Sequence, residues 1–385
     1  MHVLMLPSNY ANPYAPYKNP FYRDHARLSA ERGHATRVLA LVGISLRHAV
    51  RSRRWYFGLH RQIDAGMRTW VYPYPAPPRS ACLNQWLRYR ITTHLIRRYQ
   101  ATLGCPDIIH AHGIPAAQCA FWWHRATRAP FVVTMHSTEL YDTGASEQVQ
   151  QAGRALEYAA ERLAFSPGYA DDLNHLSGLL FDSLPNPVDT EFFRPALAGR
   201  SPERPFVFTT VADLRARKNH ALLLDAFAAR FGGDAGYSLV IAGSGPQLPR
   251  LVKRAAALGI TSQVCFRGQL NREGVRTLLQ ESDAFVLASR AETFGVVLVE
   301  ALACGLPVVA TRSHGPEAII HHQGLGLLSD HNATDLGAAM AAVTTTRYDP
   351  DALRAEAVAR YHITPVAEQL EQRYHRILAE ARDAR

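Results

Sequence analysis

The stretch Ser289–Thr311 reads SRAETFGVVLVEALACGLPVVAT and decides the fold of the second half of the chain. It follows the apolar run Asp283–Leu287, which is typical of a buried strand. A short polar loop carrying Glu292 and Gly295 comes next, and the apolar segment Val296–Cys304 then predicts a helix. We therefore expect a strand, a loop and a helix, and a second strand after them.

The loop before this predicted helix has the features of an anion site. Unpaired N–H groups at the start of a helix attract negative charge, and Gly295 lets a ligand approach the backbone. Glu300 lies five residues beyond Gly295, which is roughly 7–8 Å along a helix axis, while Glu292 lies in the loop. Two acids in this arrangement suit opposite ends of one extended ligand better than the two sides of one bond, which disfavours a glycosidase. The alternative is that both are ordinary acids in a loop and a helix.

Short apolar runs alternate with amphipathic stretches along most of the 385 residues, which predicts parallel α/β structure. This length exceeds one ordinary core, so we expect two domains. The segment Pro195–Pro205 is rich in Pro, Gly and charge and is the best linker candidate. We place the domains at residues 1–197 and 198–363, and expect a final helix, residues 364–385, that returns to the first domain.

Composition excludes several classes of protein. Hydrophobic residues make up 47% and charged residues 19%, which excludes a disordered chain. No run of about 20 residues lacks a charge, so no membrane span is expected. The five cysteines are widely spaced without a Cys-x-x-Cys pair, which speaks against a disulfide framework or zinc site and favours a reducing cytoplasm.

Positive charge is concentrated in the first half of the chain. Residues 1–200 hold 22 Lys+Arg against 14 Asp+Glu, and Arg47–Arg98 contains eleven arginines against the single acid Asp64, with aromatic residues between them. Such a region suits nucleic acid, an anionic membrane face or a phosphorylated substrate. The alternative is a solvated face in an Arg-biased chain, since Arg outnumbers Lys 39 to 3.

The spacing Glu292-x7-Glu300 within ETFGVVLVEALACGLPVVAT resembles the signature of family-4 retaining glycosyltransferases. Other segments occur in that family's order along nearly the whole chain, namely HAHG at 110–113, VTMH at 133–136, LPNPVD at 184–189, Lys218-Asn219, AGSGP at 242–246, Phe266-Arg267-Gly268 and Gly315-Pro316-Glu317. The resemblance implies the GT-B fold, with two Rossmann-like parallel-sheet domains facing a cleft. It implies no cofactor and no metal.

The resemblance also implies roles for individual residues. Glu292 would contact hydroxyls of the donor sugar, Glu300 the nucleotide ribose, and Lys218 the leaving phosphate, where charge develops. His136, at the end of a predicted strand, becomes a donor-sugar contact and catalytic helper. The remaining donor-binding candidates are loop residues around the diphosphate and arginines near the phosphates or the base: Thr293, Phe294, Gly295, Val296, Arg217 and Arg267.

Two features depart from the family pattern. Asp213 stands where relatives commonly have Arg or Ser, so it either turns away, pairs with an arginine, or is offset by Arg215 or Arg217. Pro16–Pro20 replaces the usual glycine before the first helix, which affects the acceptor loop.

Two apparent metal patterns also occur. The His110/His112 pair lacks further ligands at suitable spacing. Asp349-Pro350-Asp351 suggests a manganese motif but is interpreted as a helix start with Asp349 as its cap. Neither pattern therefore predicts a metal site.

The sequence thus predicts a metal-independent, retaining hexosyltransferase that uses a nucleotide sugar, with UDP the expected nucleotide, and a glycan or lipid-linked acceptor in polysaccharide or glycolipid assembly. We expect a cytoplasmic protein, peripheral on the inner face of the cytoplasmic membrane through Arg47–Arg98, and no nucleic acid partner. The alternatives are a GT-B nucleotide-sugar epimerase and a non-catalytic basic binding module.

Overall fold

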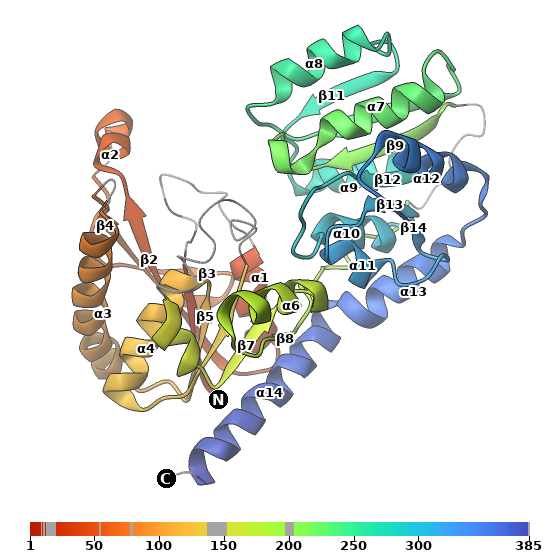
Figure 1. Cartoon of the computed structure of the whole chain (residues 1–385). Coiled ribbons are helices and arrows are strands. Elements are labelled where there is room, and N and C mark those ends of the chain that lie inside the picture. The colour runs from red at the N-terminus through yellow and green to blue at the C-terminus, as the bar shows by residue number, and fades with distance from the viewer. Residues whose placement is uncertain are drawn as a thin grey trace. The chain divides into compact units, whose positions relative to one another are not determined.

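The chain forms two compact units in the computed structural model, which describes residues 1–8, 10, 12, 21–53, 55–77, 80–136, 152–196 and 204–383 (Figure 1). Unit 1 comprises Met1–Phe165, Ala170–Leu184 and Val366–Arg385, and unit 2 comprises Ser166–Tyr169 and Pro185–Pro365. The chain thus enters unit 2 at Pro185, whereas the boundary predicted at residues 197/198 lies outside the described residues.

Unit 1 is built on an eight-stranded sheet in the order β3-β4-β2-β1-β5-β6-β7-β8. Its strands are β1 (His2–Pro7), β2 (Ala35–Ile44), β3 (His60–Asp64), β4 (Met67–Pro75), β5 (Ile108–His112), β6 (Phe131–Thr134), β7 (Glu161–Ala164) and β8 (Asp182–Ser183). The sheet is parallel except at its β3 edge, where β3 pairs antiparallel with β4. Ala65 and Gly66 both have positive φ, as a two-residue hairpin turn requires.

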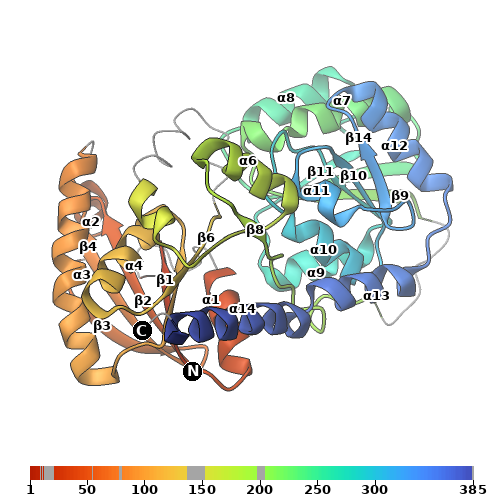
Figure 2. The same cartoon turned by 60° about the horizontal axis from the view of Figure 1, so that its bottom comes forward.

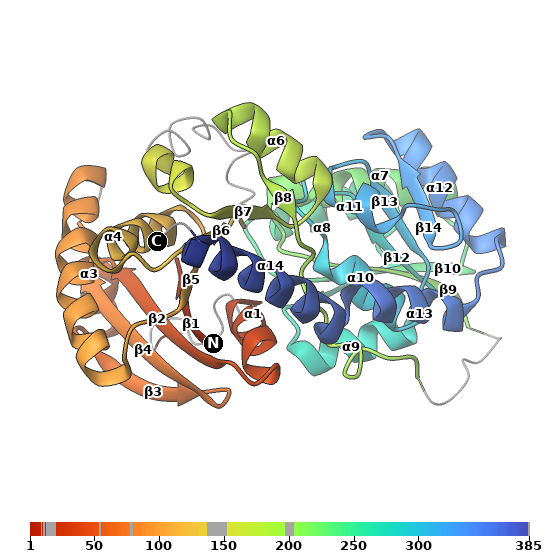
Figure 3. The same cartoon turned by 90° about the horizontal axis from the view of Figure 1, so that it is seen from below.

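Helices cover both faces of this sheet. They are α1 (Phe21–Glu31), α2 (Leu46–Ser52), α3 (Ala81–Leu103), α4 (Ile114–Thr127), α6 (Pro167–Ser177, whose first residues belong to unit 2) and α14 (Ile363–Asp383). On one face, Tyr99 of α3 packs between the rings of Trp70 and Trp123. On the other, α14 lies beside α1 (Figures 2 and 3), and Glu371 forms an ion pair with Arg32 at 2.7 Å.

Unit 2 is a wholly parallel six-stranded sheet in the order β11-β10-β9-β12-β13-β14. Its strands are β9 (Phe206–Val211), β10 (Tyr237–Ala242), β11 (Val264–Gly268), β12 (Ala284–Leu287), β13 (Val308–Thr311) and β14 (Gly326–Ser329). The chain starts at the central β9, builds outward to β11 and then returns to β12 on the other side. The strand order therefore reverses between β9 and β12, where open α/β sheets bind their ligands.

The helices of unit 2 form a layer on each side of the sheet (Figure 2). They are α7 (His220–Phe231), α8 (Leu248–Ala257), α9 (Arg272–Glu281), α10 (Val296–Ala303), α11 (Gly315–Ile319), α12 (Ala333–Thr345) and α13 (Pro350–Tyr361), with the short 3-10 helix η2 (Ala216–Lys218) before α7. Helices α7, α8 and α12 share the main core cluster, whereas Leu278 of α9 packs with Val240 and Ala242. No helix among the described residues combines the length and apolar character that crossing a membrane requires.

Candidate functional site

The candidate site lies at the carboxyl ends of β9 and β12 in unit 2. Lys218 ends η2, which follows β9, and Glu292 lies in the loop that follows β12. The two residues are 74 positions apart in the sequence, yet the lysine Nζ donates directly to Glu292 Oε2. The topology therefore brings together the two charged residues that the resemblance assigned to phosphate and sugar.

This ion pair is largely shielded from water. The Lys218 side chain is 16% exposed and that of Glu292 is 10% exposed. Removing two charges from water costs free energy that their attraction offsets only in part, so a buried pair is weak evidence of stabilisation. A pair of this kind at the sheet switch point is better explained by a ligand that uses both charges.

Backbone hydrogen bonds fix the loop that carries Glu292. The Glu292 N–H donates to the Ser313 carbonyl at 2.9 Å, and the Gly315 N–H donates to the Glu292 carbonyl at 2.8 Å. A parallel bridge pairs Glu292 with His314, whose φ of 80° is unusual for a residue other than glycine. The chain after β13 thus holds the acid on a rigid backbone.

Gly295 is the N-cap residue of the helix α10. Its φ of 96° lies in the left-handed region, and it directly precedes Val296, the first residue of this eight-residue helix. Thr293 and Phe294 before it are buried, and Glu300 lies half-buried one turn into the helix. The predicted strand, loop and helix are confirmed, except that the strand β12 begins one residue late, at Ala284, and the helix ends one residue early, at Ala303.

Close backbone contacts at glycines hold the neighbouring loops. Gly245 lies in the turn after β10, close to the backbone of Leu214. A Cβ at this position would lie only 2.8 Å from the Leu214 carbonyl carbon. The Leu214 N–H donates to the Ser244 carbonyl at 3.0 Å, and the Gly243 N–H donates to the Gly268 carbonyl at 2.7 Å. The segment 243–246 is therefore a turn after the strand β10, and it supports the loop that leads to Lys218.

Gly315 packs closely against Phe294, in the loop between Glu292 and α10. A Cβ at this position would lie 2.5 Å from Phe294 Cα and 2.6 Å from its carbonyl carbon, although Gly315 has no positive φ.

We expect Gly315→Ala to displace Thr293–Gly295 and to destabilise unit 2 by about 1–3 kcal/mol, as overpacking does. Thermal unfolding would measure this. Gly153→Ala, which meets nothing within 4 Å, is the control, and equal melting temperatures in both variants would contradict the tight contact.

The arginines near the site differ in their environments. Arg217 is half-buried in η2, and its carbonyl accepts a hydrogen bond from the Arg290 N–H at 2.8 Å. Arg267 is exposed at the end of β11. Asp213 is also exposed, and its Oδ2 lies 3.9 Å from Arg215 Nε. Of the three possibilities for Asp213, the structure shows the loose pairing with a neighbouring arginine.

Sequence reasoning did not identify Ser166 as part of this region. Its buried hydroxyl donates to the Thr293 carbonyl at 2.9 Å, and Ser166–Tyr169 belongs to unit 2. Ser166 lies two residues after the end of β7, so its place just beyond a strand was the available signal. His220 was also not identified, and burial together with Lys218 lowers its pKa to about 4.

His136 lies in unit 1, in a cluster with His25, His110 and His112. Nδ1 of His112 and Nε2 of His136 are 2.7 Å apart, and the His136 ring packs against Phe165. Burial, followed by the charge of neighbouring histidines, lowers the pKa of His112 and His136 well below the usual value. His136 is therefore held neutral. A neutral imidazole has one N–H group that can donate and one nitrogen that can accept a hydrogen bond.

The residues of the two apparent metal patterns make hydrogen bonds within the protein. His110 Nδ1 lies 2.6 Å from the Tyr374 hydroxyl, and its Nε2 lies 2.6 Å from Thr134 Oγ1, so both ring nitrogens are engaged. Asp349 caps α13, because its Oδ1 accepts from the Asp351 N–H at 3.0 Å. The predicted role of Asp349 as a helix cap is confirmed. Pro16–Pro20, which bears on the acceptor loop, lies outside the described residues.

Comparisons with known proteins cover both units. The model of the glycosyl transferase 4-like domain matches residues 20–173, and that of glycosyl transferases group 1 matches residues 196–360. The chain is 27% identical over 236 residues to the N-acetyl-alpha-D-glucosaminyl L-malate synthase of Bacillus anthracis, covering 58% of this chain and 61% of that protein. It is 31% identical over 193 residues to a GDP-mannose-dependent alpha-(1-6)-phosphatidylinositol monomannoside mannosyltransferase of Mycobacterium tuberculosis, covering 46% and 48%. The match thus spans between about half and three fifths of these relatives.

Solved structures share the fold over the full length. Anabaena HepE in complex with UDP is 17% identical with a TM-score of 0.73, covering 97% of this chain and 99% of that one. Sucrose-phosphate synthase from Thermosynechococcus elongatus is 19% identical with a TM-score of 0.76, covering 99% and 100%. Since the two family models between them match both units, the chain belongs to the family-4 (group 1) glycosyltransferases and has their GT-B fold.

Proposed function

We propose that this protein is a retaining glycosyltransferase that moves a hexose-type sugar from a UDP-sugar to an acceptor hydroxyl, without a metal ion. The observation that carries this proposal is the shielded Lys218–Glu292 pair at the switch point of unit 2, next to the start of α10. A cation, a carboxylate and a row of backbone N–H groups are the groups that a sugar diphosphate requires.

In the proposed reaction each of these groups has one task. The N–H groups around Thr293–Val296 hold the diphosphate, Glu292 accepts from the sugar hydroxyls, and Glu300 accepts from the ribose. The bond between the anomeric carbon and the phosphate oxygen breaks, and a bond to the acceptor oxygen forms on the same face. The acceptor proton passes to the leaving phosphate, whose charge Lys218 balances. His136 is proposed as a further contact to the donor sugar.

UDP is proposed as the nucleotide on the evidence of similar structures, whereas the proposed base contact, Arg267, does not distinguish UDP from GDP. The HepE structures of the same fold contain UDP, and exposed Arg267 at the end of β11 can stack on a base plane. The mycobacterial relative is named as GDP-mannose-dependent, so the test must include both nucleotides.

A panel of UDP- and GDP-sugars, supplied with lipid extracts as acceptors, tests the proposed function. We expect release of UDP from one UDP-sugar, together with an acceptor whose mass rises by one hexose. The anomeric configuration of the product, read by NMR, should match that of the donor. Conversion of the donor sugar without nucleotide release would instead support the epimerase, and no reaction with any donor would contradict the proposal.

We further propose that the acceptor is lipid-linked and that the Arg47–Arg98 region holds unit 1 on an anionic membrane surface. Within this region α2 and the start of α3 expose large apolar side chains, Val50 at 59% and Trp86 at 55%. Arginines lie among them, and the Arg90 guanidinium is 6.0 Å from the Trp86 ring. Exposed arginines next to exposed apolar groups suit the interface of an anionic bilayer, which takes up both.

We expect the double variant Trp86→Ala/Arg90→Ala to bind vesicles containing anionic phospholipid at least about threefold more weakly, since each basic residue near such a surface contributes about 1 kcal/mol. Vesicle sedimentation at low and high salt would measure this. Leu180→Ala, which removes another exposed apolar side chain from unit 1, should leave binding unchanged. Equal binding of both variants, or binding that does not depend on salt, would contradict the membrane role.

A further inference from the structure

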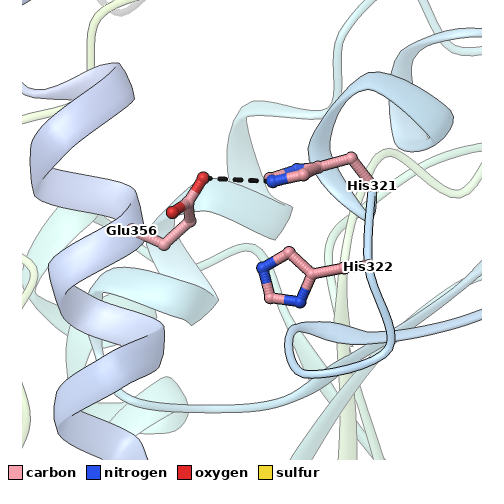
Figure 4. A group of neighbouring side chains, drawn as sticks. All are labelled: His321, His322 and Glu356. Atoms are coloured by element: carbon pink, nitrogen blue, oxygen red, sulfur yellow. Dashed lines mark ion pairs between the residues drawn. The ribbon is translucent and has the colours of Figure 1, made fainter.

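His321, His322 and Glu356 form a cluster in unit 2 that the proposed transfer reaction does not use. The two histidines follow α11, and Glu356 lies in the middle of α13. One ligand atom from each residue lies within 4.8 Å of the other two. Figure 4 shows the rings and the carboxylate directed toward a common point between the loop and the helix.

The spacing of these atoms fits a small divalent ion. His321 Nε2 lies 3.4 Å from Glu356 Oε1. Nitrogen and oxygen ligands lie about 2.0–2.2 Å from zinc, so two of them in a tetrahedral site are about 3.4 Å apart. Two histidines and one carboxylate are a common ligand set, and a water completes it. A cavity of about 430 Å³, lined by His322 and Glu356, gives a hydrated ion access.

We propose that His321, His322 and Glu356 bind one divalent transition metal ion of the zinc class, which links the chain after α11 to α13. Both histidines are exposed, so an ion would reach them without rearrangement of the core. Because α11 begins at Gly315, which is hydrogen-bonded to Glu292, the bound ion would also fix the far end of the segment that supports the candidate site.

Metal binding through Nε2 requires a ring to carry its proton on Nδ1, so that Nε2 offers a lone pair. For His321 the acceptor of this proton is already present, because Nδ1 lies 3.1 Å from the Ile319 carbonyl. Such a bond from the second ring nitrogen orients metal-binding histidines. For His322, Nδ1 accepts from the exposed Gly324 N–H at 3.1 Å, and water would replace that contact.

Arg360 is the competitor of the metal ion. Its Nη1 lies 2.7 Å from His321 Nδ1 and 3.4 Å from Glu356 Oε1. His321 Nδ1 cannot both accept from Arg360 and donate to Ile319, so the two arrangements exclude one another. The Arg360 side chain is 42% exposed and can move into solvent when the ion takes its place.

Equilibrium dialysis of tag-free, EDTA-treated protein against Zn²⁺ tests the site. We expect His322→Ala and Glu356→Gln each to weaken binding at this site at least about tenfold, as loss of a ligand should. His331→Ala, which removes an exposed histidine elsewhere in unit 2, is the control for the other histidines. Arg360→Gln should tighten binding, because it removes the competing cation.

Thermal unfolding without metal checks that the variants fold, and unfolding with Zn²⁺ should show a rise in melting temperature for the wild type that both ligand variants lose. Zinc binding and stabilisation that are unchanged in His322→Ala and Glu356→Gln would overturn the site. Unchanged or weaker binding in Arg360→Gln would overturn the competition. None of these measurements depends on glycosyl transfer.

Discussion

Replacement of Lys218 by alanine is expected to lower the rate of nucleotide release at least about a hundredfold, as loss of a group that stabilises developing charge does. Lys218 is paired with Glu292 and only 16% exposed. In the alanine variant, water would reach this position poorly and could not stabilise the phosphate charge as the ammonium group does. The loss should fall mainly on kcat, because negative charge on the leaving phosphate grows as the glycosidic bond breaks.

The control for this variant is Lys253→Ala, which removes an exposed lysine from α8. It should retain full activity. Lys218→Ala also leaves Glu292 without its partner, so Lys218→Arg, which keeps the charge, separates the two effects and should recover part of the rate. Release that is equally fast in Lys218→Ala and Lys253→Ala would remove Lys218 from the proposed mechanism.

The second large effect is expected in the pH dependence of unit 1 stability. Burial lowers the pKa of His110 to about 3, and the pKa values of His112 and His136 are well below the usual value for the same first cause. In the unfolded chain these histidines take up protons near pH 6.5. Below that pH the unfolded chain therefore binds more protons than the folded one, and stability falls as the pH falls toward the folded pKa values.

Each such histidine contributes a slope of up to about 1.4 kcal/mol per pH unit, so three of them approach about 4 kcal/mol per pH unit. Urea unfolding measured between pH 7.5 and 5 would give the slope. His110→Gln removes one titrating group and should lower it by about 1.4 kcal/mol per pH unit, whereas exposed His175→Gln should not. A stability that stays flat over this range would show that the cluster is not buried as described.

The segment Ser289–Thr311 was predictable because all of its signals are local. The apolar run of β12, the left-handed Gly295 and the apolar helix α10 follow one another within a few residues, and each has a recognisable pattern. The pairing of Lys218 with Glu292 is different, because residues 74 positions apart meet only through the order of strands in the sheet. The resemblance suggested it, and spacing alone could not.

Other features escaped sequence reasoning for physical reasons. The turn between β3 and β4 consists of Ala65 and Gly66, both with positive φ. Alanine rarely adopts a positive φ, so the sequence did not predict this turn. The contact from Ser166 to Thr293 joins residues 127 positions apart, and a serine hydroxyl carries no pattern that names its acceptor. The cluster of His25, His110, His112 and His136 brings together residues from three segments of unit 1, namely α1, β5 and the end of β6, so no spacing in the sequence could reveal their contact.

A crystal structure of the protein with an unreactive UDP-sugar analogue tests the central claim most directly. The account predicts the diphosphate at the N–H groups of Thr293–Val296, the ribose at Glu300, the sugar hydroxyls at Glu292, and Lys218 turned from that carboxylate to the phosphate. A nucleotide sugar bound away from the ends of β9 and β12, with Lys218 still paired to Glu292, would contradict it.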